Sequence, residues 1–347
     1  MVIFDNSFLY MNDSTFIVFY FFTQLIQSIF KKNCTSKERG GAIIIFESSG
    51  LTIFNTQINS SKSNFGALFY FQENYKIPIQ IIGCKFFGSY GNANLIDSFN
   101  SYVRINDTIF QDNSNNIFGV SSTTLELNNI TIKNHICYSS NQGCLISGNF
   151  LSLIVLNRIN LNSLTSLSAG NIFLEQCSIL IKFSDFNSFQ TNKFMGSCMF
   201  LQTSNANVTF SNFQNFSVNC IYSTLNGNLM IDQSNFENKD FITNANPDYG
   251  DLVCSSCSSF SITNSNFSRG SGAMKGGAIS IFSEKYFSTK NEIKIDNNKF
   301  SENLANLMGG AIYLYNVNAS VVNNTFLKNM AKIGGAIYFN NDGKINI

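Results

Sequence analysis

The sequence predicts an all-β chain that folds as a right-handed parallel β-helix solenoid of about 13 coils, each of about 26 residues. Apolar and polar residues alternate in short runs such as 102–110 and 259–267, which is the period of a β-strand and not of a helix. A Gly-Gly-Ala-Ile segment occurs four times, and weaker copies lie roughly 23 to 33 residues apart along the rest of the chain. Because one repeat cannot bury its own apolar face, the repeats are expected to stack, and parallel crossovers favour the right-handed form.

Two tetrapeptides recur in a fixed order within the strongest repeats. A Phe-x-x-Asn segment comes first, and the glycine pair follows after a polar gap. We expect the phenylalanines to stack in an interior column, the asparagines to bond at corners, and the glycines to supply positive φ. The residues assigned to this structural repeat are Phe30, Asn33, Gly40, Gly41, Gly276, Gly277, Phe300, Asn303, Gly309, Gly310, Phe326, Asn329, Gly334 and Gly335.

These tetrapeptides resemble the repeated GGAI and FxxN motifs that define the polymorphic outer-membrane proteins of chlamydiae. Related β-helix regions occur in large surface proteins of protists. The resemblance is specific at the glycine motifs and at the FxxN motifs, including Phe110 to Asn113, and it rests on periodicity between about 92 and 250. It implies a pectate-lyase-like solenoid that is exposed on a cell surface and used in adhesion.

The organisation of the chain follows from the same repeats. Residues 1–347 are expected to form a single β-helix domain, and because both ends fall within a repeat, we expect a fragment truncated at both ends. The most apolar stretch, 16–30, is shorter than the roughly twenty residues of a spanning helix, so no membrane span is predicted. We expect a cell-surface or secreted location as part of a longer protein.

Composition narrows the range of partners. Only 12% of the residues are charged and the net charge is +1, so nothing favours a nucleic-acid partner. The polar surface must come from uncharged groups, since the chain contains 51 asparagines and 44 serines. Glycans or other surface proteins are the partners that fit such a surface. We expect no cofactor, because no phosphate-binding loop, dinucleotide fingerprint or zinc-protease motif is present.

Acidic residues are the candidates for catalysis, because β-helices that cleave polysaccharides need clustered carboxylates. The 21 acids are scattered along the sequence. The best local cluster is Asp107 and Asp112 with Arg104, and Asp185, Asp232 and Asp296 are expected at comparable second-strand positions. The single histidine, His135, is expected to be structural. We therefore predict no catalytic residue.

The nine cysteines do not form a recognised framework. Cys144, Cys198 and Cys220 stand where the glycine motif has alanine, so we expect them to act as small core residues. A bridge between Cys137 and Cys144 across a corner loop remains open. A zinc site at Cys254 and Cys257 is disfavoured, because the pair has no second pair or matching histidine.

The function predicted from these observations is that of a non-enzymatic structural or adhesive segment of a larger cell-surface or secreted protein. One alternative is a carbohydrate-binding or carbohydrate-cleaving β-helix. Another is an intracellular scaffold, since the chain shows no clear export signal. Stacked acids or an aromatic groove on one outer face would favour the carbohydrate-active alternative.

Overall fold

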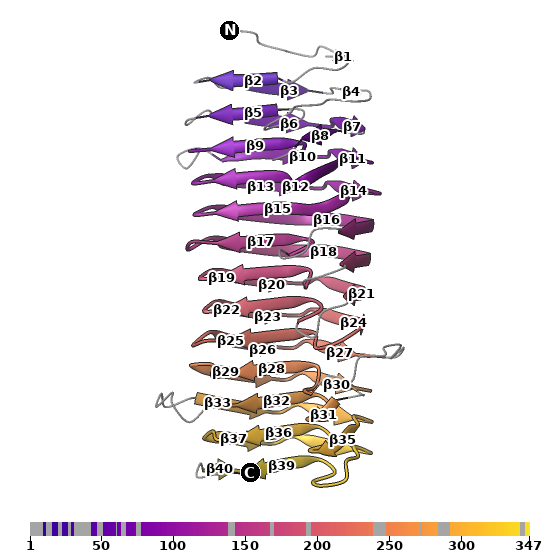
Figure 1. Cartoon of the computed structure of the whole chain (residues 1–347), viewed down its shortest axis with the longest axis vertical. Coiled ribbons are helices and arrows are strands. Elements are labelled where there is room, and N and C mark those ends of the chain that lie inside the picture. The colour runs from indigo at the N-terminus through magenta and orange to yellow at the C-terminus, as the bar shows by residue number, and fades with distance from the viewer. Residues whose placement is uncertain are drawn as a thin grey trace. The chain divides into compact units, whose positions relative to one another are not determined.

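The computed structural model shows an all-β chain, and each element among the described residues is a β-strand (Figure 1). The chain divides into two compact units, Met1–Ser168 and Ala169–Ile347. The structure describes residues 10–11, 16–19, 23–26, 29–30, 43–46, 51–59, 61–63, 67–73, 78–137, 143–166, 170–191, 196–238, 248–270, 273–283, 292–340 and 344–347.

In the first unit, strands of successive coils pair in parallel on three sides of the coil. One side contains β2, β5, β9, β12, β15 and β17. The strands of the unit are β1 (Tyr10–Met11), β2 (Phe16–Phe19), β3 (Thr23–Ile26), β4 (Ile29–Phe30), β5 (Ile43–Phe46), β6 (Leu51–Phe54), β7 (Gln57–Asn59), β8 (Lys62–Ser63), β9 (Phe69–Gln72), β10 (Ile79–Ile82), β11 (Lys85–Phe87), β12 (Tyr90–Phe99), β13 (Tyr102–Asn106), β14 (Ile109–Gln111), β15 (Ser114–Ser121), β16 (Thr124–Cys137), β17 (Ile146–Asn149) and β18 (Leu153–Ser166).

The second unit repeats this arrangement. We call the side that the second strand of each coil forms the second side. It contains β20, β23, β26, β29, β33, β37 and β40 in parallel register. The strands of the unit are β19 (Ile172–Glu175), β20 (Ser178–Lys182), β21 (Asp185–Thr191), β22 (Met199–Gln202), β23 (Asn205–Thr209), β24 (Asn212–Phe216), β25 (Ile221–Thr224), β26 (Asn228–Asp232), β27 (Asn235–Glu237), β28 (Leu252–Ser255), β29 (Ser259–Thr263), β30 (Asn266–Ser268), β31 (Ala273–Lys275), β32 (Ile279–Phe282), β33 (Glu292–Asp296), β34 (Lys299–Ser301), β35 (Ala305–Met308), β36 (Ile312–Tyr315), β37 (Ala319–Val322), β38 (Thr325–Leu327), β39 (Ile337–Asn340) and β40 (Ile345–Asn346).

The parallel pairing in both units confirms the predicted class, an all-β parallel solenoid. The right-handed form stays a prediction, and so does the interpretation of residues 1–347 as a single truncated domain. Inward-pointing residues alternate with outward ones along the strands, as in β29, where Phe260 and Ile262 are buried between three partly exposed neighbours. The core of each unit is therefore a column of apolar side chains inside the stacked coils.

Phenylalanine forms the longest ring column inside the second unit. Phe300 and Phe326 stack with their ring centroids 5.1 Å apart and an interplanar angle of 9°. The column continues with centroid spacings of 4.8 to 5.1 Å through Phe186, Phe213, Phe236 and Phe267. Because parallel pairing places equivalent residues one strand spacing apart, one phenylalanine per coil is enough to build the column.

The asparagine of the FxxN segment joins adjacent coils. The Oδ1 atom of Asn303 accepts a hydrogen bond from the main-chain N–H of Gly270 at 3.0 Å, and its Nδ2 atom donates to the main-chain oxygen of Phe267 at 3.1 Å. Asn329 makes the same pair of bonds to Asn303 and Phe300. The amide thus satisfies main-chain groups that a buried corner would otherwise leave without partners.

The glycine pair has two separate steric causes. Gly309 has a φ of +64°, and Gly276 and Gly334 also have positive φ, a region that other residues occupy at a cost. A Cβ atom on Gly310 would lie 2.6 Å from the main-chain nitrogen of Met330, so this position needs the absence of a side chain. The assigned residues Asn33, Gly40 and Gly41 lie outside the described residues, whereas Phe30 belongs to β4 and pairs with Ile58 of β7.

Candidate functional site

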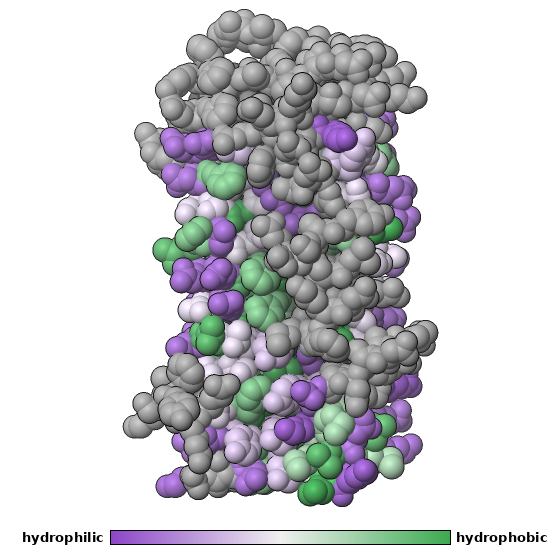
Figure 2. Space-filling view, viewed as in Figure 1, coloured by the Kyte–Doolittle hydropathy of each residue, from purple (hydrophilic) through white to green (hydrophobic). Residues whose placement is uncertain are grey.

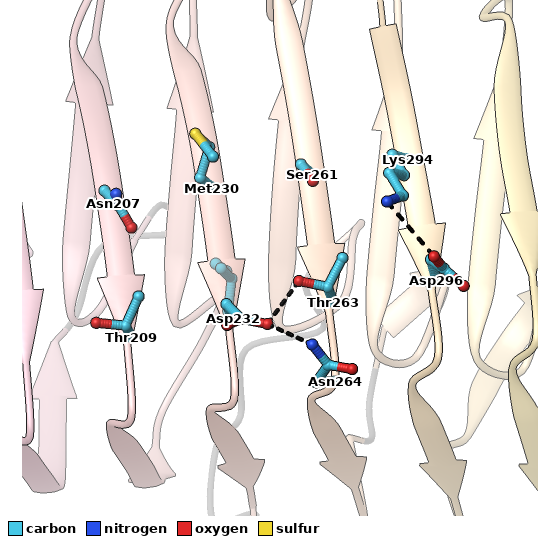
Figure 3. A pocket seen from close by; sticks show the side chains of 10 residues that line it. Asn207, Thr209, Met230, Asp232, Ser261, Thr263, Asn264, Lys294 and Asp296 are labelled. Carbon is cyan, nitrogen blue, oxygen red and sulfur yellow. Dashed lines mark hydrogen bonds and ion pairs between the residues drawn. The ribbon is translucent and has the colours of Figure 1, made fainter.

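A polar groove lies on the outer surface of the second side of the second unit. It has a volume of about 500 Å³ and crosses β23, β26, β29 and β33 (Figure 3). On the face drawn in Figure 2, hydrophilic and hydrophobic side chains of the described residues are interspersed. The groove is lined by Asn207, Thr209, Met230, Ile231, Asp232, Ser261, Thr263, Asn264, Lys294 and Asp296.

The groove is hollow because short side chains alternate with long ones across neighbouring strands. Met230 pairs in register with Ser261, and Ser261 pairs with Lys294. The serine is therefore flanked by two longer side chains, one from each adjacent coil (Figure 3). Parallel stacking turns this size pattern into a depression, since equivalent residues lie about 4.8 Å apart.

Asp232 is oriented by the next coil. Its Oδ1 atom accepts hydrogen bonds from the Thr263 hydroxyl at 2.6 Å and from the Asn264 amide at 2.7 Å. Thr263 is the register partner of Asp232, and Asn264 lies at the corner that follows, with a φ of +51°. The carboxylate consequently leans along the groove toward β29, as Figure 3 shows.

Asp296 is held differently. Its Oδ2 atom lies 3.4 Å from Lys294 Nζ on the same strand, and its Oδ1 atom accepts a hydrogen bond from the Asn323 amide at 3.1 Å. The Lys294 side chain is more than half exposed, so its ammonium group remains accessible to a ligand. A partly exposed ion pair of this kind contributes little to stability.

The two carboxylates face the groove from positions two strands apart. Asp232 pairs with Thr263, and Thr263 pairs with Asp296, so two strand spacings, roughly 9.6 Å, separate the two backbones. Glycosidases that invert configuration also use two carboxyl groups, one on each side of the bond that they cleave. The arrangement offers hydrogen-bond acceptors, hydroxyl and amide groups and one cation along a single open surface.

The structure brings together only some of the acids that sequence analysis selected. Asp232 and Asp296 do share one column of the second side, as expected. Asp185 does not, because it begins β21 on the third side and accepts a hydrogen bond from Asn212 at 2.7 Å. Sequence analysis missed Thr263, although the repeat could have indicated it, since 263 − 232 = 31 and 296 − 263 = 33 match neighbouring coil lengths.

The cluster around Arg104 does not form a site with the two aspartates beside it in sequence. Arg104 pairs instead with Glu126 on the adjacent strand β16, at 2.7 Å. Glu126 raises the pKa of the Arg104 guanidinium through their hydrogen bond. Asp107 and Asp112 each accept a hydrogen bond from an asparagine one coil further on, at 2.6 and 3.2 Å. These carboxylates therefore serve as links between coils.

The cysteines fall into bridged and free groups. Cys137 and Cys144 form a disulfide with their Cα atoms 5.6 Å apart, which corrects the expectation that Cys144 is only a small core residue. The two cysteines are seven residues apart in sequence, and their Cα separation is usual for a disulfide. Cys198 and Cys220 are buried and free, as expected for small core residues. Cys254 and Cys257 are joined to each other as well.

The comparisons with known proteins yield two similar solved structures. No protein-family model matches the chain, and no curated protein matches it significantly. Both structures are catalytic domains of a GH87 alpha-1,3-glucanase. A variant in complex with tetrasaccharides has a TM-score of 0.39 and 8% identity, and the complex with nigerose has a TM-score of 0.38 and 11% identity. Each match covers 94% of this chain but 64% of the other, so the chain spans less than two thirds of these domains.

The comparisons contradict the expectation of a non-enzymatic structural or adhesive segment, because the similar structures are catalytic domains in complex with saccharides. At this low similarity the two structures assign no activity to the chain. The likeness to chlamydial polymorphic outer-membrane proteins remains a resemblance of motifs. Within the described residues, no helix is long and apolar enough to span a membrane.

Proposed function

We propose that the second unit binds a carbohydrate chain in the groove between Asp232 and Asp296. The observation that supports this proposal is the row of carboxylate, hydroxyl, amide and ammonium groups, half-buried or exposed, that line a groove of about 500 Å³. Sugar hydroxyls both donate and accept hydrogen bonds, so a lining that offers both kinds of partner suits them. Open clefts with a few convergent polar groups are the usual form of a ligand site.

The groove also offers an apolar contact. The side chain of Met230 is 52% exposed at the wall of the groove, beside Ser261. A flexible thioether adapts to irregular apolar surfaces, so it can pack against the C–H face of a sugar ring. The groove's two aspartates and one lysine leave an excess of negative charge, which favours a neutral glycan over a polymer of uronic acids.

The test is a binding measurement with neutral and acidic glycans. Asp232→Ala removes a carboxylate from the groove and is expected to weaken binding of the neutral glycan about tenfold. Asp185→Ala is the matched control, because Asp185 likewise accepts a hydrogen bond from an asparagine amide of the next coil but lies on another side. Equal binding by the parent and Asp232→Ala, with both folded by circular dichroism, would show that the groove is not the site.

Cleavage is the second candidate function, and the observation that favours it is that two carboxylates line the same groove. In an inverting reaction, one carboxyl group gives a proton to the leaving oxygen while the other takes a proton from the attacking water. Asp232→Asn and Asp296→Asn are each expected to abolish release of reducing ends without unfolding the chain. Product of retained configuration would exclude this mechanism, and binding without turnover would leave only the binding function.

A further inference from the structure

A buried cluster of one imidazole and two sulfur atoms lies in the first unit, far in sequence from the groove. The ligand atoms of His135, Cys137 and Cys144 all lie within 4.8 Å of one another. His135 and Cys137 belong to β16, and Cys144 precedes β17. The three residues are at most 1% exposed. Nitrogen and sulfur are the ligand atoms that zinc prefers in proteins.

The orientation of β16 shows that this cluster is built by the strand. Along its last residues, Ile136 is 42% exposed, while His135 and Cys137 on either side of it are buried. An ordinary half-buried strand would place the isoleucine inside and the imidazole outside. The strand therefore buries His135 and Cys137, whose side chains can bind a metal ion, and exposes the apolar side chain of Ile136.

The histidine also departs from the repeat. The register Gln111↔Lys133 and Ser114↔Ile136 makes His135 the counterpart of Asn113 in the preceding coil. Asn113 bonds both Ser89 N–H and the Phe86 main-chain oxygen through its amide, as the FxxN asparagines of the second unit do with their own neighbours. His135 thus replaces the amide of Asn113 with an imidazole, whose ring nitrogens can also bind a metal ion.

We propose that reduction of the Cys137–Cys144 disulfide opens a zinc site formed by both thiolates and the His135 imidazole. The reduction takes two electrons and two protons from an external dithiol, which becomes a disulfide itself. Zn²⁺ then binds the two sulfur atoms and releases their protons, while neutral imidazole supplies the third ligand and water the fourth. Oxidation reverses the process, so the cluster alternates between a bridge and a metal site.

The experiment uses Co²⁺ as a spectroscopic substitute for Zn²⁺ on the full chain, before and after reduction. The reduced parent is expected to bind one Co²⁺ with a thiolate charge-transfer band that Zn²⁺ removes, and the oxidised parent is expected to show no such band. Cys144→Ala is expected to lower the affinity about 100-fold or more, and His135→Asn is expected to lower it as well. Both replacements match residues of other coils, since Ala67 and Asn113 occupy the corresponding corners.

Cys177→Ser is the matched control, because the next coil has Ser204 at that corner and the cysteine lies outside the cluster. It is expected to bind Co²⁺ like the parent. If a variant unfolds, alkylation of the reduced parent answers the question, since Zn²⁺ should protect Cys137 and Cys144 from iodoacetamide. Absence of protection, a band that persists in the oxidised chain, or equal affinity in Cys144→Ala would each overturn the proposal. Glycan binding by the second unit does not depend on the outcome of these metal-binding experiments.

Discussion

The side chain of Asn303 is bonded to the main chain of Phe267 in the preceding coil, over 3.1 Å. The two residues are 36 positions apart in sequence, so this bond fixes how one coil sits on the next. Its counterpart between Asn329 and Phe300 spans 29 positions. The same amide therefore accommodates coils of different length, because the bond depends on the corner and not on the loops between corners.

Replacing this amide is the first prediction. Asn303→Ala should lower the free energy of unfolding by about 1–3 kcal/mol, because Gly270 N–H and the Phe267 oxygen lose a buried partner. Asn235→Ala is the control, since Asn235 makes its inter-coil bonds on the exposed surface. Urea unfolding should show a change of about 0.5 kcal/mol or less for the control. Equal midpoints for both variants would contradict a structural role of the buried amide.

The second prediction separates buried from exposed ring stacking. Phe213 is fully buried and stacks on Phe186 and Phe236 at 4.8 Å. Phe210, three residues earlier, stacks on Phe183 at 5.0 Å but is 49% exposed. Phe213→Ala should cost about 3–5 kcal/mol, and Phe210→Ala much less, because only the first leaves a cavity. Thermal or urea unfolding of the pair measures the difference, and similar losses would mean that stacking and not burial stabilises the column.

The third prediction concerns the glycine pair in the last complete coil. Gly309→Ala should destabilise the chain, because the residue has a φ of +64° and its Cβ atom would lie 2.8 Å from the carbonyl carbon of Ile312. A cost of about 1 kcal/mol or more is expected from the backbone conformation alone. Gly335→Ala is the control, since its Cβ atom would lie at an ordinary 3.5 Å from the main-chain oxygen of Asn329. A chain that tolerates both changes equally would disprove the steric argument.

The fold could be predicted because the same sequence pattern recurs in successive coils. Each coil places Phe, Asn and Gly at the same positions, so local steric needs at Phe300, Asn303 and Gly309 indicate the architecture without knowledge of distant contacts. The parallel solenoid class follows from that repetition. Handedness does not, since it rests on a general preference of crossovers and not on particular residues.

The groove could not be predicted with the same success, because it depends on register across coils of unequal length. Asp232, Thr263 and Asp296 form one column only when spacings of 31 and 33 residues are combined. An error of three residues moved Asp185 to the wrong side of its coil, since β20 ends at Lys182 and β21 begins at Asp185. The cluster of His135 with Cys137 and Cys144 was missed because the pairing of cysteines does not follow from their spacing in sequence.

The last prediction concerns a carboxyl group in the core. Asp251 lies between Cys220 and Ala278 in the register of successive coils, at the position where the glycine motif has alanine. It is 4% exposed, and its Oδ2 atom has no hydrogen-bond partner among the described residues. Burial raises the pKa of Asp251 well above its ordinary value near 3.8. The folded state therefore keeps this proton at pH values where the unfolded chain has already lost it.

This difference makes stability fall as the pH rises. Below about pH 3.8 both states hold the proton and the group adds no penalty, whereas above that value the unfolded state alone ionises until the raised pKa of the folded state is reached. Asp251→Ala should thus be more stable than the parent at pH 7, by about 1–3 kcal/mol, because it removes a buried carboxyl that lacks a partner. Near pH 3.5 the advantage should be smaller, because the unfolded chain then also holds the proton and only the cost of burying the neutral carboxyl remains. Urea unfolding of both proteins from pH 3.5 to 7 measures the difference in their free energies of unfolding. The contributions of the other carboxyl groups are the same in both proteins and cancel in this difference. A difference that stays constant over this range would show that Asp251 is ionised in the folded state at every pH tested or interacts with a compensating group.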